Sequence, residues 1–221
     1  MGGPTAYHFP KTIKTTAHTT LVMISVGEMK RLEDVTVKKG ISRLTLMETS
    51  GSKVAVSLGT DIFRKNVAVF CGDSDNGGIG FVAARALAFH CKVTVLFVGQ
   101  EDKLSPESRI NLQRIARNGR IKIIKSTSDF DKNQDFVIDS LMGIEYTGEP
   151  MSEAMKKAIM QFNLSTGVKI CVDVPSGMNA ETGEVAELSC SADKIIALHD
   201  MKKGLVKFKD KIVSADIGIR P

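Results

Sequence analysis

Short apolar runs alternate with stretches of helical spacing along most of this chain. The runs that predict buried strands lie at residues 67–70, 92–98, 121–124, 136–139, 168–174, 194–198 and 212–215. The run at residues 67–70 is apolar and rich in β-branched residues, which is typical of a strand buried on both faces. Strands that alternate with helices predict a mainly parallel sheet covered on both faces. We therefore expect one doubly wound α/β domain.

Polar residues with capping chemistry mark the expected helices. Ser25 and Glu28 form an S-x-x-E capping box ahead of an apolar stripe, and Pro106 after Ser105 suits the first position of a helix. The expected helices run from Ser25 to Gly40, from near Ser42, from Ser105 to Gly119 and over residues 152–162. Two helices thus precede the first buried strand and would form an N-terminal cap on the domain.

The stretch VAVFCGDSDNGGIGFVAAR at residues 67–85 is the clearest candidate for a binding site. A strand leads into a glycine turn, and helical spacing begins at Phe81. The glycines of this turn are Gly72, Gly77, Gly78 and Gly80. This order directs free backbone N–H groups and a helix N-terminus at an anion. A tight turn that binds nothing is the alternative, but Asp75 and Asn76 add side-chain oxygens that such a turn does not need.

Polar side chains also follow two later strands. Asp139 ends one strand, and Asp173 near the end of the next is followed by Ser176. In a parallel sheet these ends meet Asp75 and Asn76 at one rim, where ligands of such folds bind. Each aspartate alone is typical of a turn or helix cap, whereas carboxylates gathered at a buried rim require a cation or a raised pKa. Oxygen ligands without His or Cys suit a hard cation rather than zinc.

Composition narrows the classes of function. The 221 residues, 43% of them apolar, suffice for one domain with a proper core. The net charge of +5 permits a loose attraction to phosphates, but the Lys and Arg residues are spread along the chain. With two Tyr and no Trp there is little for bases to stack on, so we expect no nucleic-acid partner. No apolar run approaches the ~20 residues that span a bilayer, so we expect no membrane partner.

The cysteines and the N-terminal residues indicate the compartment. Residues 1–22 are Thr-rich and contain no signal-peptide core, so we predict an extension there and one domain over residues 23–221. We do not expect His8 or His18 of this extension to be ligands. The four cysteines lie far apart without a CxxC, which indicates free thiols in a reducing compartment, the cytoplasm. They are Cys71, Cys91, Cys171 and Cys190.

Five ordered motifs resemble those of the YjeF N-terminal domain family, the NAD(P)HX epimerases, which include homologues of the apolipoprotein A-I-binding protein. LMETSG at residues 46–51 is similar to LMENAG, and CGDSDNGGIGFVAAR at 71–85 to CGxGNNGGDGxVxAR. VIDSLMG at 137–143 resembles the DAxFG segment, VDVPSGMNAETG at 172–183 resembles DIPSGxxxxxG, and ADIGI at 215–219 matches the usual ending. The set is highly specific, although each motif alone is weak.

The resemblance implies a three-layer α/β/α Rossmann-like fold that binds NADHX and NADPHX, the hydrated nicotinamide dinucleotides. A potassium ion would be held by Asn76, Asp139 and Ser176. Asp173 would face the damaged nicotinamide ring. Lys202 or Lys203 would match the lysine that the family has after a late strand, a choice that the sequence leaves open. The other substrate-binding residues would be Asp75, Asn76, Gly77, Gly78 and Ile79, with Gly143, Ile144, Glu145, Tyr146, Thr147, Gly148 and Glu149.

These residue types suit the epimerisation of such substrates. In NADHX the C6 carbon carries a hydroxyl beside the ring nitrogen, whose lone pair assists loss of the hydroxyl and leaves an iminium-like cation. Water that returns on either face interconverts the R and S forms. We hypothesise that Asp173 protonates the departing hydroxyl, stabilises the cation and activates the returning water, which contributes roughly 10²–10⁴-fold in rate. Asp173→Asn is expected to keep the fold and abolish epimerisation.

Two departures from the family pattern support other hypotheses. Ile79 stands where the family has an aspartate, and Asp75 where it has an asparagine, so Asp75 either restores the lost charge or repels the pyrophosphate. Glu145 is unfavourable beside a phosphate unless it points away. The alternatives are a catalytically silent nucleotide-binding or scaffold protein on the same fold, and an enzyme that handles another nucleotide. The retained Asp173 and cation-site residues favour the epimerase.

The resemblance also suggests partners. The chain has no room for the dehydratase domain that is often fused to this one, so a separate NAD(P)HX dehydratase is expected. A homodimer is the default expectation for a soluble oligomer.

Overall fold

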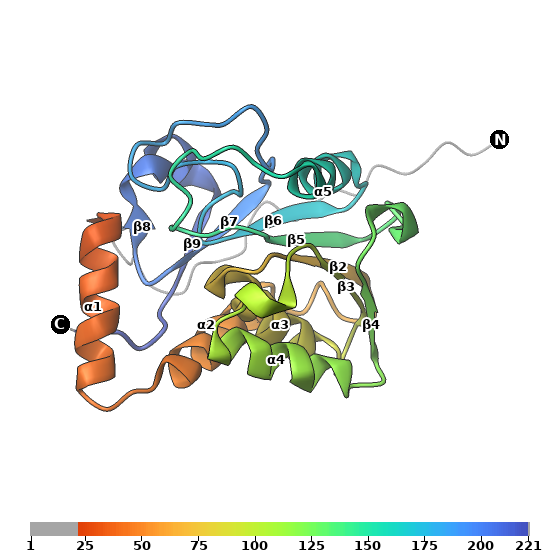
Figure 1. The fold of residues 1–221 in the computed structure, drawn as a ribbon, viewed down its shortest axis with the longest axis horizontal. Coiled ribbons are helices and arrows are strands. Elements are labelled where there is room, and N and C mark those ends of the chain that lie inside the picture. The colour runs from red at the N-terminus through yellow and green to blue at the C-terminus, as the bar shows by residue number, and fades with distance from the viewer. Residues whose placement is uncertain (1–21, 221) are drawn as a thin grey trace.

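The structure is a computed structural model that describes residues 22–220. The predicted N-terminal extension, with His8 and His18, lies outside the described residues apart from Val22. The described part of the chain contains a seven-stranded sheet flanked by helices (Figure 1). The predicted α/β fold class is therefore confirmed.

The central sheet consists entirely of parallel pairings, in the order β4-β3-β2-β5-β6-β7-β9. Its strands are β2 (Asn66–Cys71), β3 (Lys92–Phe97), β4 (Ile121–Ile124), β5 (Phe136–Ser140), β6 (Val168–Val172), β7 (Lys194–Leu198) and β9 (Ile212–Ala215). Successive strands are added outward from β2 in one direction and from β5 in the other. The order therefore reverses between β2 and β5, and doubly wound sheets bind their ligands at that reversal.

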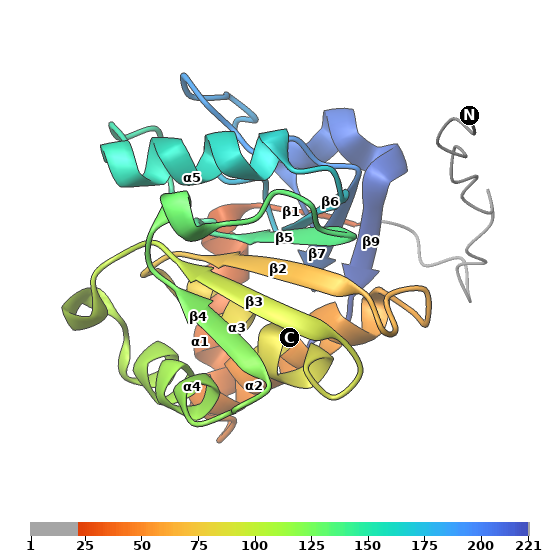
Figure 2. The same cartoon turned by 90° about the vertical axis from the view of Figure 1, so that its right-hand side faces the viewer.

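Two hydrophobic cores lie on opposite faces of the sheet. Along β2, Val67 and Val69 belong to one core, whereas Ala68 and Phe70 belong to the other. The first face is covered by α2 (Arg43–Ser57), α3 (Asp75–Leu87) and α4 (Pro106–Ala116). The second face is covered by α5 (Glu153–Leu164) and the 3-10 segment Lys203–Lys211. Figures 1 and 2 show the resulting three layers, as expected.

Serine side chains cap the N-termini of four α-helices of the described chain. Their oxygens accept a backbone N–H bond at the starts of α1 (Val26–Lys38), α2, α4 and α5. Only half of the predicted capping box of α1 forms, because the Glu28 carboxylate binds Arg31 instead of the N-cap backbone. α4 ends at Ala116, three residues before the predicted Gly119. These differences concern the ends of elements, where local signals compete with nearby partners.

The glycine turn and two very short strands differ from expectation. α3 begins at Asp75, so Gly77, Gly78 and Gly80 lie inside the helix and the prediction of a four-glycine turn is wrong. The pairing of β1 (Met23–Ile24) with β8 (Met201–Lys202) was not predicted, because two residues are too short for a periodic pattern. This pairing fastens the segment before α1 to the segment that carries Lys202.

The membrane and cysteine expectations can also be compared with the structure. Within residues 22–220, no helix combines the length and the apolar character needed to cross a membrane. The four cysteines are free thiols, as expected. Burial raises the pKa of the Cys71, Cys171 and Cys190 thiols, so these residues act as buried apolar groups. No cluster of three or more His, Cys, Asp or Glu in the described chain could hold a metal ion.

Candidate active site

The N-terminus of α3 is not capped by its serine. Ser74 at the N-cap makes no side-chain hydrogen bond to the helix, whereas serines cap the other α-helices of residues 22–220. The Ser74 hydroxyl instead points to the carbonyl oxygen of Leu141 at 3.5 Å. The first turn of α3 therefore keeps its N–H groups for another acceptor, and a helix N-terminus of this kind favours a phosphate.

Asn76 connects this first turn to the ends of β5 and β6. Its side-chain nitrogen donates to the carbonyl oxygens of Met142 and Val172, the latter at 3.3 Å. The backbone carbonyl oxygen of Asn76 accepts a 2.7 Å hydrogen bond from the Ser140 hydroxyl. The predicted convergence of three strand ends is thus present, and it lies at the point where the strand order reverses.

Asp139 and Ser176 form a second, fully buried part of this connection. The Ser176 hydroxyl donates to Asp139 Oδ1 at 2.6 Å, and the Ser176 N–H donates to Oδ2 at 2.8 Å. The N–H of Met142 in turn donates to the Ser176 hydroxyl at 2.8 Å. Burial raises the pKa of Asp139, while the bonds from Ser176 and Leu141 act in the opposite direction. The structure therefore brings Asn76, Asp139 and Ser176 together through Met142.

These three residues fit a hard cation. Asn76 Oδ1 is buried and finds no hydrogen-bond partner in the described chain. A buried oxygen without a partner is costly, so a nearby positive charge would stabilise it. The set contains only carboxylate, amide and hydroxyl oxygens, which are ligands that hard cations prefer.

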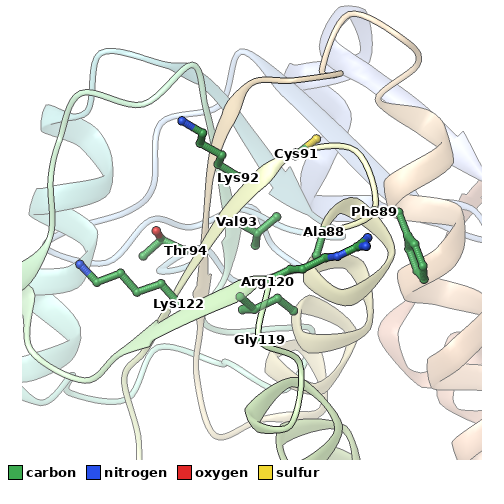
Figure 3. A pocket seen from close by; sticks show the side chains of 10 residues that line it. Ala88, Phe89, Cys91, Lys92, Val93, Thr94, Gly119, Arg120 and Lys122 are labelled. Carbon is green, nitrogen blue, oxygen red and sulfur yellow. The ribbon is translucent and has the colours of Figure 1, made fainter.

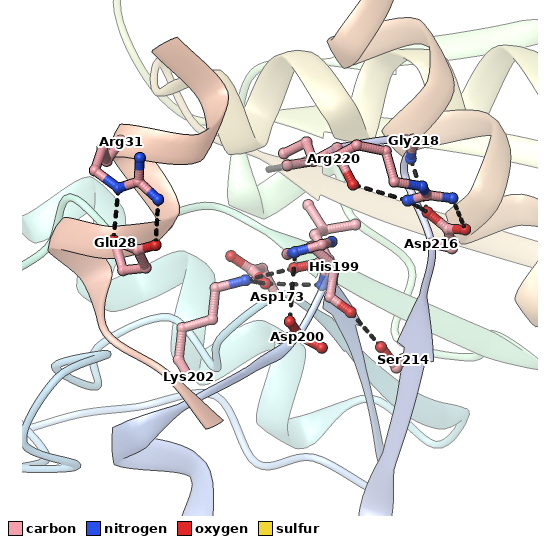
Figure 4. A network of polar contacts seen from close by, with 12 residues as sticks. Glu28, Arg31, Asp173, His199, Asp200, Lys202, Ser214, Asp216, Gly218 and Arg220 are labelled. Atoms are coloured by element: carbon pink, nitrogen blue, oxygen red, sulfur yellow. Dashed lines mark hydrogen bonds and ion pairs between the residues drawn. The ribbon is translucent and has the colours of Figure 1, made fainter. Parts of the chain in front are cut away.

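Asp173 and Lys202 form a buried ion pair at the end of β6. Asp173 has a left-handed backbone (φ 66°), and its N–H donates to the carbonyl oxygen of Ile196 at 2.8 Å. Its Oδ1 accepts bonds from the Leu198 N–H at 2.9 Å and from the Lys202 ammonium at 2.5 Å (Figure 4). The bonds that the structure shows to this carboxyl all reach Oδ1. Oδ2 is therefore available to a ligand.

The structure decides between the two candidate lysines. Lys202 is fully buried and also donates to the carbonyl oxygen of Leu198 at 2.7 Å. Lys203 is exposed and pairs with Glu181 at 2.9 Å. Only Lys202 therefore belongs to the site, and the β1–β8 pairing that places it was invisible in the sequence.

A pocket between the helices of the first face contains the residues that depart from the family pattern. Ile79 and Asp75 line it from α3, and Glu33 lines it from α1. Asp75 Oδ1 accepts bonds from the Ser105 hydroxyl at 2.6 Å and the Ser108 hydroxyl at 3.3 Å. The Asp75 carboxylate is therefore committed to the start of α4 and does not replace the charge missing at Ile79.

Glu33 was not among the residues predicted for the site. It is half-buried, and its position between the buried residues Met29 and Thr36 follows the helical spacing of the inward face of α1. A carboxyl group at an inward position of an amphipathic helix was the signal that could have identified it.

The loop at residues 143–149 is divided between two places. Gly143 lies against the Asn76 side chain, where an added Cβ would come within 3.1 Å. Glu145 points to Lys30 of α1 at 2.8 Å, so its charge is paired away from α3. Tyr146, Gly148 and Glu149 instead line a separate depression with Met151 and Lys156. Their role in substrate binding stays a prediction.

A further depression lies far from these groups. It is lined by the first residues of β3 and β4, at the opposite end of the strands from Asp139 and Asp173 (Figure 3). Arg120 extends across it toward Phe89, with 6.0 Å between the guanidinium carbon and the ring centre. This depression contains no carboxyl group and is not part of the candidate site.

Comparison with known proteins agrees with the sequence motifs. Residues 43–204 match the family described as YjeF-related protein N-terminus. The chain therefore belongs to this family, and the expected resemblance is confirmed.

Two relatives and one solved structure extend this result. An NAD(P)H-hydrate epimerase of Nitrosopumilus maritimus is 32% identical over 90% of this chain and 96% of its own length. A bifunctional NAD(P)H-hydrate repair enzyme of Methanothermobacter thermautotrophicus is 36% identical over 82% of this chain, which spans only 37% of that enzyme. The crystal structure of yeast YNL200c has a TM-score of 0.75 and 18% identity over 88% of this chain and 87% of its own. The last comparison supports the fold alone.

Proposed function

We propose that this protein is an NAD(P)H-hydrate epimerase that interconverts the R and S forms of NADHX and NADPHX. Relatives that carry the name NAD(P)H-hydrate epimerase support the activity. The observation that carries it in this chain is the adjacency of two features. Asn76 in the uncapped turn of α3 bonds to Val172, and the next residue is Asp173 with its buried lysine. The proposed phosphate site would therefore be adjacent to the Asp173–Lys202 ion pair.

The chemistry assigned to Asp173 follows from its environment. Asp173 forms an ion pair with Lys202, and a negatively charged carboxylate suits a group that stabilises an iminium-like cation. When water returns to C6, the same carboxylate accepts the proton that the water loses. Burial strengthens the attraction between the Asp173 carboxylate and a developing positive charge, because water is excluded from the site. Lys202 acts as a positioning residue through its contact with Oδ1.

The backbone N–H groups at the start of α3 would bind a phosphate of the dinucleotide. Asn76, Asp139 and Ser176 would hold a potassium ion, which supplies positive charge beside that phosphate. Because Glu145 is paired with Lys30, it does not oppose a phosphate at this helix start.

A direct assay tests the proposed activity. Pure R-NADHX is incubated with and without protein in potassium buffer, and formation of the S form is followed by chromatography. Acceleration by the protein supports the epimerase and shows that Ile79 is tolerated. Saturable nucleotide binding without acceleration would instead support a catalytically silent binding or scaffold protein, the alternative that Ile79 favours.

The cation site makes a prediction that does not depend on activity. Potassium should raise the thermal stability relative to tetramethylammonium at equal ionic strength, because it satisfies the buried Asn76 Oδ1. A ligand at about 100 times its Kd stabilises by about 2.7 kcal/mol. The measurement is the unfolding midpoint in each salt, with Asn76→Ala as the variant that should lose the difference. Equal stability of the unmodified protein in both salts would argue against the site.

Partner and compartment are proposed on the same basis. A dehydratase that acts on NAD(P)HX is the proposed functional partner, because relatives of this chain are named bifunctional NAD(P)H-hydrate repair enzymes. The four free thiols support a reducing compartment such as the cytoplasm. A homodimer stays a prediction.

A further inference from the structure

The carboxyl group of Glu33 faces the pocket that contains Ile79. Glu33 of α1 is half-buried there, and no hydrogen bond to its carboxyl comes from residues 22–220. The pocket is formed by residues from four helices and the C-terminal segment. The charged residues that line it besides Glu33 are Arg43, Asp75 and Glu107, and Ile79 lies among them.

Epimerisation needs two proton transfers, and the ion pair suits only one of them. The departing hydroxyl must receive a proton, whereas the returning water must lose one. Asp173, paired with the Lys202 ammonium, accepts the proton in the second transfer and returns it in the reverse reaction. A different group has to supply the first proton.

We propose that Glu33 is the proton donor for the departing C6 hydroxyl and that Asp173 is the base for the returning water. This inference rests on the proposed epimerase function. The C6–O bond breaks, the nitrogen lone pair forms the C=N bond, and the Glu33 proton leaves with the hydroxyl as water. A second water then attacks C6, the C=N electron pair returns to nitrogen, and the released proton passes to Asp173. Because one water leaves from one side of C6 and another returns from the other side, the configuration at C6 is inverted. In the reverse reaction Asp173 donates the proton and Glu33 accepts it.

The protonation behaviour of Glu33 agrees with this role. Burial first, and the charge of Asp173 second, raise the pKa of Glu33 to about 7, against the opposing effect of Lys202 and Arg43. Both protonation states are therefore populated near neutral pH, where a general acid is most effective. The charged groups around Glu33 are Arg43 on α2, Asp75 on α3, Glu107 on α4, Asp173 after β6 and Lys202 on β8.

The other carboxyl groups of this pocket are less suited to donate a proton. Asp75 is bonded to Ser105 and Ser108. Glu107 lies in the first turn of α4, where a negative charge interacts favourably with the helix N-terminus. Glu33 is thus the carboxyl that remains for this transfer after Ile79 has replaced the aspartate of the family pattern.

The pH dependence of stability provides a first test. A carboxyl whose pKa is raised on folding binds its proton more tightly in the folded state than in the unfolded state. The contribution of this carboxyl to the free energy of unfolding therefore decreases as pH rises from the ordinary pKa of 4.5 to about 7. Glu33→Gln should remove this decrease. As pH rises across that range, the unfolding midpoint of the variant should therefore increase relative to that of the unmodified protein, which is the expected gain. The exposed Asp210→Asn, which lies outside this pocket, should not show the gain.

The kinetic test uses the same two variants in the epimerisation assay. Glu33→Gln is expected to lower kcat by about 10²-fold or more with a small change in KM, and to abolish the limb of the pH profile near 7. Glu33→Asp should recover part of the rate, and Asp210→Asn should match the unmodified enzyme. An active protein whose rate and pH profile survive Glu33→Gln would overturn the role of Glu33 alone. An inactive unmodified protein would overturn the proposed function, and the role of Glu33 with it.

Discussion

Asp173→Asn is expected to lower kcat for epimerisation by about 10²–10⁴-fold, because the amide cannot accept the proton of the returning water. The backbone at this position is left-handed (φ 66°), a conformation that asparagine adopts readily. The local chain geometry is therefore compatible with the substitution. The measurement is the rate of S-NADHX formation, compared with the unmodified protein at saturating substrate.

The buried ion pair revises one expectation drawn from the sequence. Asp173→Asn leaves the Lys202 ammonium buried without its counter-charge, and breaking such a pair costs about 3–5 kcal/mol. We therefore expect the single variant to be destabilised rather than to keep full stability. The double variant Asp173→Asn with Lys202→Met removes the stranded charge, so it should regain stability while it stays inactive. Full activity in either variant would exclude Asp173 as the base, and Lys203→Met serves as the exposed control.

Gly77→Ala is expected to destabilise the protein by about 3 kcal/mol or more, at or beyond the upper end of overpacking effects. A Cβ at this position would lie 2.0 Å from the carbonyl oxygen of Gly72, which belongs to the backbone and cannot rotate away. The first turn of α3 would have to move away from the end of β2. The measurement is the free energy of unfolding in denaturant, and nucleotide binding should weaken as the N–H groups of that turn move.

Gly27→Ala is the matched control for this prediction. Gly27 also lies in the first turn of a helix, α1, but an added Cβ there meets no atom within 4 Å. Alanine has a higher helix propensity than glycine, so this variant should gain up to about 1 kcal/mol. A similar small gain for Gly77→Ala would show that α3 does not need a glycine at this position.

Local patterns predicted most of the sheet. The strands Ile121–Ile124, Lys194–Leu198 and Ile212–Ala215 have the predicted limits, since short apolar runs bounded by polar residues are a local signal. The glycine stretch at residues 72–80 predicts a turn, because glycine is a poor helix former. Tertiary packing outweighed that preference. α3 starts close to the backbone of Gly72, where only glycine fits.

The candidate site was predicted in part. Asn76, Asp173 and Ser176 follow strands of one parallel sheet, and Asp139 lies near the end of another strand, so their convergence could be predicted from topology alone. Lys202 and Glu33 could not be assigned in this way, because each reaches the site through a contact between distant segments. Lys202 depends on the pairing of β1 with β8, and Glu33 on the packing of α1.

The sequence by itself determined the fold class, the family and the strand ends that carry oxygen ligands, because each follows from local spacing or ordered motifs. The tertiary structure decided which charges act together. It buried Lys202 against Asp173, engaged Asp75 with the start of α4, turned Glu145 toward Lys30 and placed Glu33 beside Ile79. The physical reason is that burial and the nearest opposite charge set the behaviour of an ionisable group, and both depend on residues far away in the chain.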